Sequence, residues 1–343
     1  MKTIRVLVAD DSLFMRAAIK KLLTADPRFE IVGEAKDGRD AVDKVQALKP
    51  DVCTMDFNMP ILDGAAAVRE IMQLRPTPVV MLSAHTRQGA KETFEALAAG
   101  AVDFLAKPSG EVSAELTKIG VALRDKVAAA AQSRPMPMAH TPRPAAAPRI
   151  TASRAVGVVG PKVVVVGVST GGPAALGRFL PRFPADTSLA ILVVQHLPAG
   201  FTAALAERLD SMSAIRVREA ADGDRPEAGL ALVAPGDRHL EVLPDGTLRT
   251  TDDPEVNGVR PSADVTMRSA ACVFGRRVVG VVMTGMGRDG AEGMRAIKAF
   301  GGATLVQDEA SSVIWGMPRA CVEGGSADRI VPLDALADAV RTA

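Results

Sequence analysis

The chain has 343 residues, enough for two or three domains of ordinary size, and its net charge of +1 does not favour nucleic acid or an acidic surface as a partner. No apolar run reaches the roughly 18 residues that a membrane span needs, and the acidic N-terminal region is unlike a signal peptide, so we expect no membrane insertion. The three cysteines are widely separated and odd in number, which indicates a reducing cytoplasm rather than a disulfide framework.

Strand-like and helix-like patterns alternate over residues 1–125, the first predicted domain. The predicted strands are 4–9, 30–35, 51–55, 78–82 and 102–106. The predicted helices are roughly 12–25, 38–48, 64–75, 87–98 and 111 to about 130. This alternation predicts an α/β fold, a doubly wound parallel sheet of five strands with helices on both faces.

A change of composition separates this region from the rest of the chain. Residues 133–154 are rich in proline and alanine and lack hydrophobic periodicity, so we interpret 126–160 as an interdomain linker. A nucleic-acid-binding arm is the weaker interpretation, because the arginines of this stretch are few and scattered.

A second α/β pattern, also predicted to be doubly wound, occupies 161–343. Its predicted strands are 162–168, 189–195, 229–235, 239–243, 277–284 and 303–308. Its predicted helices lie near 173–180, 200–210, 261–274, 290–299 and 316–322. It has no basic recognition helix of the kind that a DNA-binding output domain would need.

Polar residues follow the strands of the first domain. They are Asp10, Asp11, Asp56, Ser83 and Lys107. The carboxyl ends of parallel strands meet at one edge of a sheet, so we expect these side chains to converge. Clustered carboxylates call for a cation, and hard oxygen ligands suit Mg²⁺, while a lysine opposite them suits a phosphoryl group. A helix-capping role would explain any one of these acids but not the whole set.

The segments VADDS, MDFNMPILDG, MLSAHT and FLAKPSG resemble a response-regulator receiver domain. The resemblance implies that Asp56 accepts phosphate from a histidine kinase and that Ser83 and Lys107 contact the phosphoryl group. It also implies that Phe104 is the aromatic residue that reorients on activation. The Mg²⁺ ligands it implies are Asp10, Asp11, Asp56 and the backbone carbonyl of Asn58.

A buried strand in the second domain leads into a serine between glycines, in the stretch VVVVGVSTGGPAAL (163–176). Gly167–Gly171 fits the G-x-S-x-G nucleophile elbow, which presents Ser169 beside a helix N-terminus. A serine that only caps the next helix is the alternative, and glycine-rich turns also bind phosphate. The P-loop and dinucleotide patterns fail, because no Gly-Lys-Ser/Thr follows and Ser169 replaces the second glycine.

A nucleophilic serine needs a base, and two histidines lie in this domain. His196 ends the strand that follows the elbow, so it is predicted at the same edge of the sheet as Ser169. His239 begins a strand in APGDRHLEV, and we expect it on a surface loop. Topology therefore favours His196, although either histidine is also explained as a capping residue.

The orienting acid is predicted in VVGVVMTGMGRDGAEGM (278–294), where a buried strand enters a glycine-rich turn that contains Asp289. The competing interpretation is that Asp289 caps the helix beginning near Gly290. The chain order Ser, His, Asp differs from the α/β-hydrolase order, which would instead pair His239 with Asp222 or Asp224.

The segments GVSTGGPAAL, VVQHLPAGF, LVAPGDRHLEV, RPSADVTMRSAA, VMTGMGRDGAEGM and QDEASSVIWGMPRA resemble the output domain of the chemotaxis protein-glutamate methylesterases, the CheB family. The resemblance implies Ser169 as nucleophile, His196 as base and Asp289 as orienting acid. It places the oxyanion site at the Met286 turn and around Thr170, and it assigns no catalytic role to APGDRH.

The same resemblance implies the cellular role. The substrates would be glutamate methyl esters and glutamine amides on chemoreceptors, in the cytoplasm. The esterase chemistry would need no cofactor. The unphosphorylated receiver would cover the catalytic cleft until Asp56 is phosphorylated, and the outcome would be adaptation in chemotaxis. Two other hypotheses stay open: a receiver-controlled hydrolase of another ester or amide, and a non-catalytic signalling module.

Overall fold

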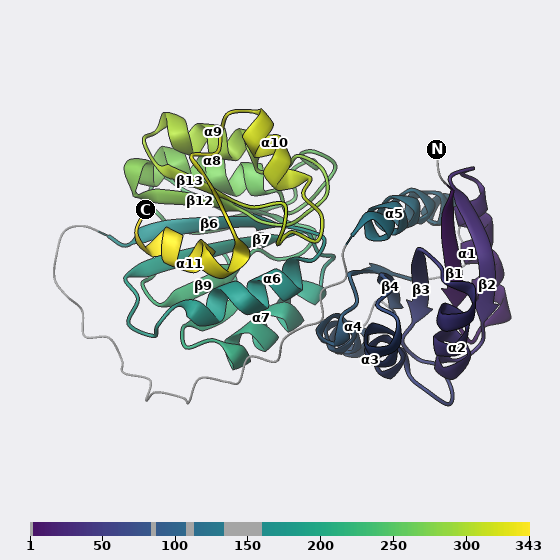
Figure 1. Cartoon of the computed structure of the whole chain (residues 1–343). Coiled ribbons are helices and arrows are strands. Elements are labelled where there is room, and N and C mark those ends of the chain that lie inside the picture. The colour runs from purple at the N-terminus through teal and green to yellow at the C-terminus, as the bar shows by residue number, and fades with distance from the viewer. Residues whose placement is uncertain (1–2, 84–86, 108–112, 134–159) are drawn as a thin grey trace. The chain divides into compact units, whose positions relative to one another are not determined.

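The structure is a computed structural model that describes residues 3–83, 87–107, 113–133 and 160–343. The chain forms two compact units, Met1–His140 and Thr141–Ala343 (Figure 1). No helix within the described ranges is long and apolar enough to cross a lipid bilayer.

The first unit is a parallel sheet of five strands in the order β2-β1-β3-β4-β5, which confirms the predicted doubly wound fold. Its strands are β1 (Ile4–Ala9), β2 (Phe29–Ala35), β3 (Val52–Asp56), β4 (Val79–Ser83) and β5 (Asp103–Ala106). Its helices are α1 (Leu13–Thr24), α2 (Gly38–Leu48), α3 (Gly64–Leu74), α4 (Arg87–Ala99) and α5 (Ser113–Gln132). The strand order reverses between β1 and β3, and side chains that follow these two strands therefore share one crevice.

Helix α5 runs across the predicted boundary between the first domain and the linker. The boundary between residues 125 and 126 falls inside this helix, which continues to Gln132 and packs beside α1. The apolar residues Val127 and Ala130 of its last turns are fully buried, which explains why the helix extends past the predicted boundary. Most of the predicted linker, 134–159, lies outside the described residues.

The second unit contains a parallel sheet of seven strands in the order β14-β13-β12-β6-β7-β9-β8 and a separate antiparallel hairpin, β10-β11. The strands are β6 (Lys162–Val168), β7 (Leu189–Gln195), β8 (Arg216–Glu219), β9 (Leu230–Val233), β10 (His239–Val242), β11 (Leu248–Thr251), β12 (Val278–Val282), β13 (Ala303–Gln307) and β14 (Arg329–Val331). The helices are α6 (Gly172–Phe179), α7 (Phe201–Met212), α8 (Ala263–Phe274), α9 (Ala291–Ala299), α10 (Met317–Glu323) and α11 (Leu333–Arg341), with 3₁₀ turns η1 (Leu180–Arg182) and η2 (Gly275–Arg277).

The central strands of this sheet explain where its polar residues gather. β6 and β7 are continuous apolar runs that are buried on both faces, as expected of inner strands of a parallel sheet. β6 lies between β7 and β12, so the strand order reverses here as well. The segments that follow β6, β7 and β12 therefore meet at one edge of the sheet.

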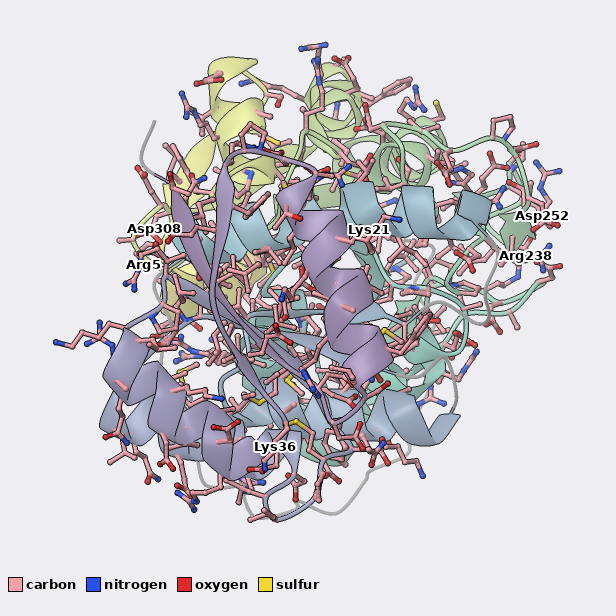
Figure 2. All side chains as sticks on the ribbon, turned by 90° about the vertical axis from the view of Figure 1, so that its right-hand side faces the viewer. Arg5, Lys21, Lys36, Arg238, Asp252 and Asp308 are labelled. Atoms are coloured by element: carbon pink, nitrogen blue, oxygen red, sulfur yellow. The ribbon has the colours of Figure 1, made fainter. Side chains whose placement is uncertain are left out.

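The hairpin β10-β11 packs on α8 and not in the main sheet. The Thr266 hydroxyl donates to the Leu240 carbonyl at 2.7 Å, and the Ser269 hydroxyl accepts from the Val242 N–H at 3.0 Å. At the solvent side of the hairpin, Arg238 pairs with Asp252 at 3.2 Å (Figure 2). The hairpin is thereby fixed to α8.

We expect truncation of a buried strand residue to weaken the second unit far more than the same truncation at the sheet edge. Ile191 of β7 is fully buried, whereas Ile330 of β14 is 52% exposed. Ile191→Ala should lower the free energy of unfolding by about 2–5 kcal/mol, and the control Ile330→Ala by less than about 1 kcal/mol. Urea unfolding followed by the fluorescence of Trp315, the single tryptophan, measures both; equal losses would contradict this account of the core.

Candidate functional site

In the first unit, three carboxylates converge at the crevice between β1 and β3. Asp10 and Asp11 follow β1, and Asp56 is the last residue of β3; Asp10 and Asp56 are buried, whereas Asp11 is exposed. One oxygen from each carboxylate lies within 4.8 Å of the others. Hard oxygen donors at this spacing fit Mg²⁺, so the residues present match the ion that the sequence predicted.

Lys107 supplies the positive charge in this cluster. Its Nζ lies 2.9 Å from Asp10 Oδ2 and 2.8 Å from Asp56 Oδ1. Burial raises the pKa of Asp56 even though the lysine opposes this, and the charge of Asp10 adds to the rise. Burial alone would lower the pKa of Lys107, but its two carboxylate partners outweigh that effect and raise it.

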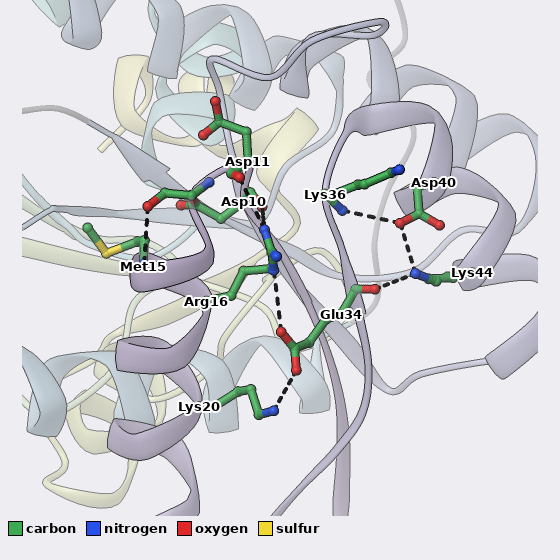
Figure 3. A network of polar contacts seen from close by, with 10 residues as sticks. Asp10, Asp11, Met15, Arg16, Lys20, Glu34, Lys36, Asp40 and Lys44 are labelled. Carbon is green, nitrogen blue, oxygen red and sulfur yellow. Dashed lines mark hydrogen bonds and ion pairs between the residues drawn. The ribbon is translucent and has the colours of Figure 1, made fainter.

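Arg16 of α1 fixes the turn that carries the two N-terminal acids, a role that sequence reasoning missed. Its Nη1 donates to the backbone carbonyls of Asp10 at 2.8 Å and Asp11 at 3.2 Å (Figure 3). Its Nε donates to Glu34 of β2, which also binds Lys20. The acids and the arginine are therefore held by one network that joins β1, α1 and β2.

The other residues predicted for this unit lie at the end of β4, after β3 and in β5. Ser83 ends β4, its hydroxyl donates to the Gly89 carbonyl at 2.9 Å, and its own carbonyl accepts from the Lys107 N–H at 2.7 Å. Asn58 is exposed, and its amide donates to Glu92 at 3.2 Å. Phe104 of β5 is buried.

In the second unit, the turn after β6 requires its two glycines for different reasons. Gly171 has a φ of 77°, a backbone conformation that residues with a Cβ rarely adopt. A Cβ there would also lie 2.7 Å from Val313, so both the backbone conformation and the available space exclude a larger residue. At Gly172 a Cβ would lie 1.9 Å from Gln195 Oε1, so close approach to β7 is the constraint. The glycines allow Ser169 to lie directly between the end of β6 and the start of α6.

The backbone of Ser169 is fixed while its hydroxyl is not. Its N–H donates to the Thr284 carbonyl at 3.0 Å, and its carbonyl accepts from Gln195 Nε2 at 3.0 Å. No described residue forms a hydrogen bond with Ser169 Oγ. A Cβ on Gly285 would lie 2.8 Å from Ser169 Cβ, so the turn after β12 passes next to the serine side chain.

His196 follows β7 and contacts Asp289, as the sequence analysis expected of a base and its acid. His196 Nε2 lies 2.8 Å from Asp289 Oδ2. An ionised carboxylate can only accept, so Nε2 carries the proton in this contact. Nδ1 is then the ring nitrogen of a neutral His196 that remains able to accept a proton.

Asp289 is buried and surrounded by donors at the N-terminus of α8. The donors besides His196 are Ser262 Oγ at 2.6 Å, the Ala263 N–H at 2.6 Å, the Asp264 N–H at 3.3 Å and Asn257 Nδ2 at 3.1 Å. Burial alone would raise the pKa of Asp289, but these hydrogen bonds, above all the one from His196, lower it to about 2. Asp289 therefore stays ionised near neutral pH.

The alternative role for Asp289, capping of the helix that begins near Gly290, is wrong. The N-cap of α9 is Gly290, which makes no side-chain capping bond, and Asp289 instead caps α8. Asp264 contributes a cap to α9, since its Oδ1 accepts from the Gly293 N–H at 2.6 Å. Burial raises the pKa of Asp264, and Asn257 Nδ2 bridges the two carboxylates.

The rival triad based on His239 is not assembled. His239 is buried and not on a surface loop, and its ring contacts the Ser262 N–H and the Pro254 carbonyl. Asp222 accepts from Thr250, and Asp224 pairs with Arg218. Neither acid is a partner of His239.

Of the two predicted oxyanion residues, Thr170 lies in the serine turn and Met286 lies in the segment after β12. Thr170 is buried, and its carbonyl accepts from Thr284 Oγ1 at 2.9 Å. Met286 is exposed, and no described residue accepts a hydrogen bond from its N–H. Sequence reasoning missed Asn257 and Ser262; only the Ser-Ala-Asp beginning of α8, a helix-capping pattern, marks the latter.

The lowered pKa of Asp289 predicts a pH dependence of stability. A carboxyl whose pKa falls from 3.8 to about 2 on folding stabilises the native state above pH 3.8 and loses this contribution as the pH falls through about 2. The full contribution is about 2 kcal/mol, of which about 1 kcal/mol should be lost between about pH 5 and pH 3. Urea unfolding of the wild type and of Asp289→Asn measures the difference; parallel pH curves would contradict it.

Comparisons with known proteins cover both units. A model of the CheB methylesterase family matches residues 164–340, and a model of the response regulator receiver domain matches residues 6–118. The protein-glutamate methylesterase/protein-glutamine glutaminase of Symbiobacterium thermophilum is 47% identical over 352 residues, which cover 100% of this chain and 97% of that protein. The protein of the same name from Pyrococcus abyssi is 45% identical and covers 99% of this chain and 93% of its own length.

A solved structure agrees with the second unit. The crystal structure of the Thermotoga maritima CheB methylesterase catalytic domain matches with a TM-score of 0.52 and 38% identity, over 54% of this chain and 99% of that domain. The match of family models and of relatives along the whole length leads to one conclusion. This chain belongs to the CheB methylesterase family and also carries a response regulator receiver domain.

Proposed function

We propose that this chain hydrolyses glutamate methyl esters on chemoreceptors, deamidates receptor glutamines, and is activated by phosphorylation of Asp56. The observation that carries the esterase assignment is the 2.8 Å contact of His196 with buried Asp289, at the sheet edge that also carries Ser169. Relatives along the whole chain are named protein-glutamate methylesterase/protein-glutamine glutaminase, which supports this substrate class. Such turnover in the cytoplasm would serve sensory adaptation.

The first half of the reaction transfers the glutamyl group to the enzyme. Ser169 Oγ attacks the γ-carbonyl carbon while His196 Nδ1 takes the serine proton. The bond from carbon to the methoxy oxygen then breaks, and His196 gives its proton to that oxygen, so methanol leaves. Asp289 stays ionised throughout and stabilises the imidazolium that forms between these two steps.

The second half regenerates the serine. Water, deprotonated by His196, attacks the glutamyl ester, and the bond to Ser169 Oγ breaks as the serine recovers its proton. The product is a glutamate carboxylate. With a glutamine substrate the same steps release ammonia in place of methanol.

Both steps place negative charge on the carbonyl oxygen, which needs donors at a fixed position. We assign this role to the Met286 N–H and to the region around Thr170, at the N-terminus of α6. Two observations support the assignment: the Met286 N–H has no acceptor among the described residues, and Gly285 lies against the Ser169 side chain. The positive end of α6 adds to the same field.

The acidic cluster of the first unit is the proposed phosphorylation site. Asp56 would receive the phosphoryl group from a histidine kinase, and Lys107 and Ser83 would contact its oxygens. Asp10, Asp11, Asp56 and the Asn58 carbonyl would hold Mg²⁺, which supplies charge neutralisation for the carboxylates and the phosphoryl oxygens. Phe104 would reorient as the unit changes state.

Removal of the nucleophile should abolish turnover. We expect Ser169→Ala to lower methanol release from methyl-labelled receptor membranes at least about 1,000-fold, and Asp289→Asn to lower it less, because the serine forms the acyl bond itself. The control Ser211→Ala changes an exposed serine of α7 and should keep wild-type release. Substantial release by Ser169→Ala would rule out this nucleophile, and no release by the wild type would point to another acyl substrate.

Phosphorylation should raise the same activity. With Mg²⁺ and a small phosphodonor such as acetyl phosphate, methanol release should increase about 5–150-fold, the usual range of coupling between two sites. The increase should vanish in Asp56→Asn and persist in the control Asp43→Asn, an exposed acid of α2. Release that ignores the phosphodonor in the wild type would contradict activation by the receiver.

A further inference from the structure

A second histidine of the catalytic unit, His239, has no part in the proposed reaction and is nevertheless 1% exposed. It is the first residue of β10 and lies opposite Thr251 in the hairpin. The hydrogen-bond partners of its ring come from two different segments of the chain, the loop after β11 and the start of α8. A buried imidazole with polar partners on both nitrogens calls for an explanation beyond packing.

The partners of His239 define its protonation state. The Ser262 N–H can only donate, and it lies 3.2 Å from Nδ1, so Nδ1 is an acceptor without a proton. The Pro254 carbonyl can only accept, and it lies 3.1 Å from Nε2, so Nε2 carries the proton. His239 is therefore a neutral imidazole in one tautomer, with both ring nitrogens in use.

Both segments that contact His239 also donate a hydrogen bond to Asp289. Ser262 is the N-cap of α8, and its hydroxyl donates to Asp289 at 2.6 Å. Three residues after Pro254, Asn257 donates to the same carboxylate at 3.1 Å. His239 thus joins the two segments whose side chains donate to Asp289 Oδ1, the oxygen that His196 does not contact.

We propose that His239 is a positioning residue, which keeps Asp289 aligned with His196 by holding the Ser262 N–H in place. The proposal rests on the proposed function of Ser169, His196 and Asp289. Without its acceptor the Ser262 N–H is buried and unpaired, which is unfavourable unless the start of α8 moves toward another partner. Such a movement shifts the Asp289 carboxylate, and misplacement of about 1 Å is enough to lower a rate about 100-fold.

The distinctive feature of this role is that the two ring nitrogens contribute unequally. His239→Asn keeps an acceptor oxygen near the position of Nδ1 and loses the donor to Pro254. His239→Gln keeps a donor near the position of Nε2 and leaves the Ser262 N–H unpaired. Each variant removes one buried hydrogen bond, so a merely structural role predicts similar effects of the two, whereas positioning through Ser262 predicts that only the glutamine variant is slow.

The experiment measures kcat and KM for methanol release by the full chain. The rates are divided by the concentration of folded protein, which Trp315 fluorescence reports. We expect His239→Gln to lower kcat at least about tenfold with KM changed less than about twofold, and His239→Asn to stay within about threefold of the wild type. Ser262→Ala, which removes the hydroxyl bond to Asp289 and leaves His239 in place, should also lower kcat. The control Thr250→Val removes a half-buried hydrogen bond from the same hairpin to Asp222 and should leave kcat unchanged.

Several outcomes would overturn the proposal. Equal kcat values for His239→Gln and His239→Asn would contradict it. A rise in KM with unchanged kcat in His239→Gln would also contradict it, as would a wild-type kcat in Ser262→Ala. Ser169→Ala in the same assay separates the two hypotheses. If it retains turnover, the proposed function fails and the positioning role with it; if it is inactive while His239→Gln keeps the wild-type kcat, only the positioning role fails.

Discussion

The catalytic unit depends on a carboxylate that is buried and ionised at the same time. Asp289 is 2% exposed, and in such surroundings a charge is costly unless donors surround it. The N-terminus of α8 supplies backbone N–H groups and the positive end of a helix, and the side chains of His196, Ser262 and Asn257 supply the other donors. The N-terminus of α8 thus holds the Asp289 carboxylate in place, and the carboxylate orients the imidazole ring of His196.

The two units share one feature of their parallel sheets but differ in the charges that gather there. In both, polar residues follow parallel strands at the point where the strand order reverses. In the first unit three carboxylates lie together and two of them, Asp10 and Asp56, pair with Lys107, an arrangement that fits a divalent ion and a phosphoryl group. In the second, hydrogen-bond donors surround Asp289, and His196 is its titratable partner of opposite charge when protonated. The same feature of a parallel sheet thus underlies both proposed reactions, phosphoryl transfer to the first unit and acyl transfer in the second.

The sequence predicted strands with continuous apolar runs well, and it missed short ones. β6 and β7 were predicted with their observed ends, which put Ser169 and His196 at one edge of the sheet. The missed strands β8, β11 and β14 have three or four residues each and contain charged or polar residues, whereas β9, which is equally short, is a continuous apolar run and was predicted. The surroundings of Asp289 were not predictable either, because Asn257 and Ser262 reach it from a distant segment and nothing local in the chain marks that contact.

The central claim is that Asp289 orients His196 so that Nε2 carries the proton and Nδ1 faces the reaction. Nitrogen NMR of the full chain with ¹⁵N-labelled histidine tests it directly, because the chain has four histidines and the His196→Gln variant identifies the signal of His196. The account predicts a neutral His196 protonated at Nε2, with a signal that moves in Asp289→Asn. A proton on Nδ1, or a signal indifferent to the loss of the carboxylate, would contradict it.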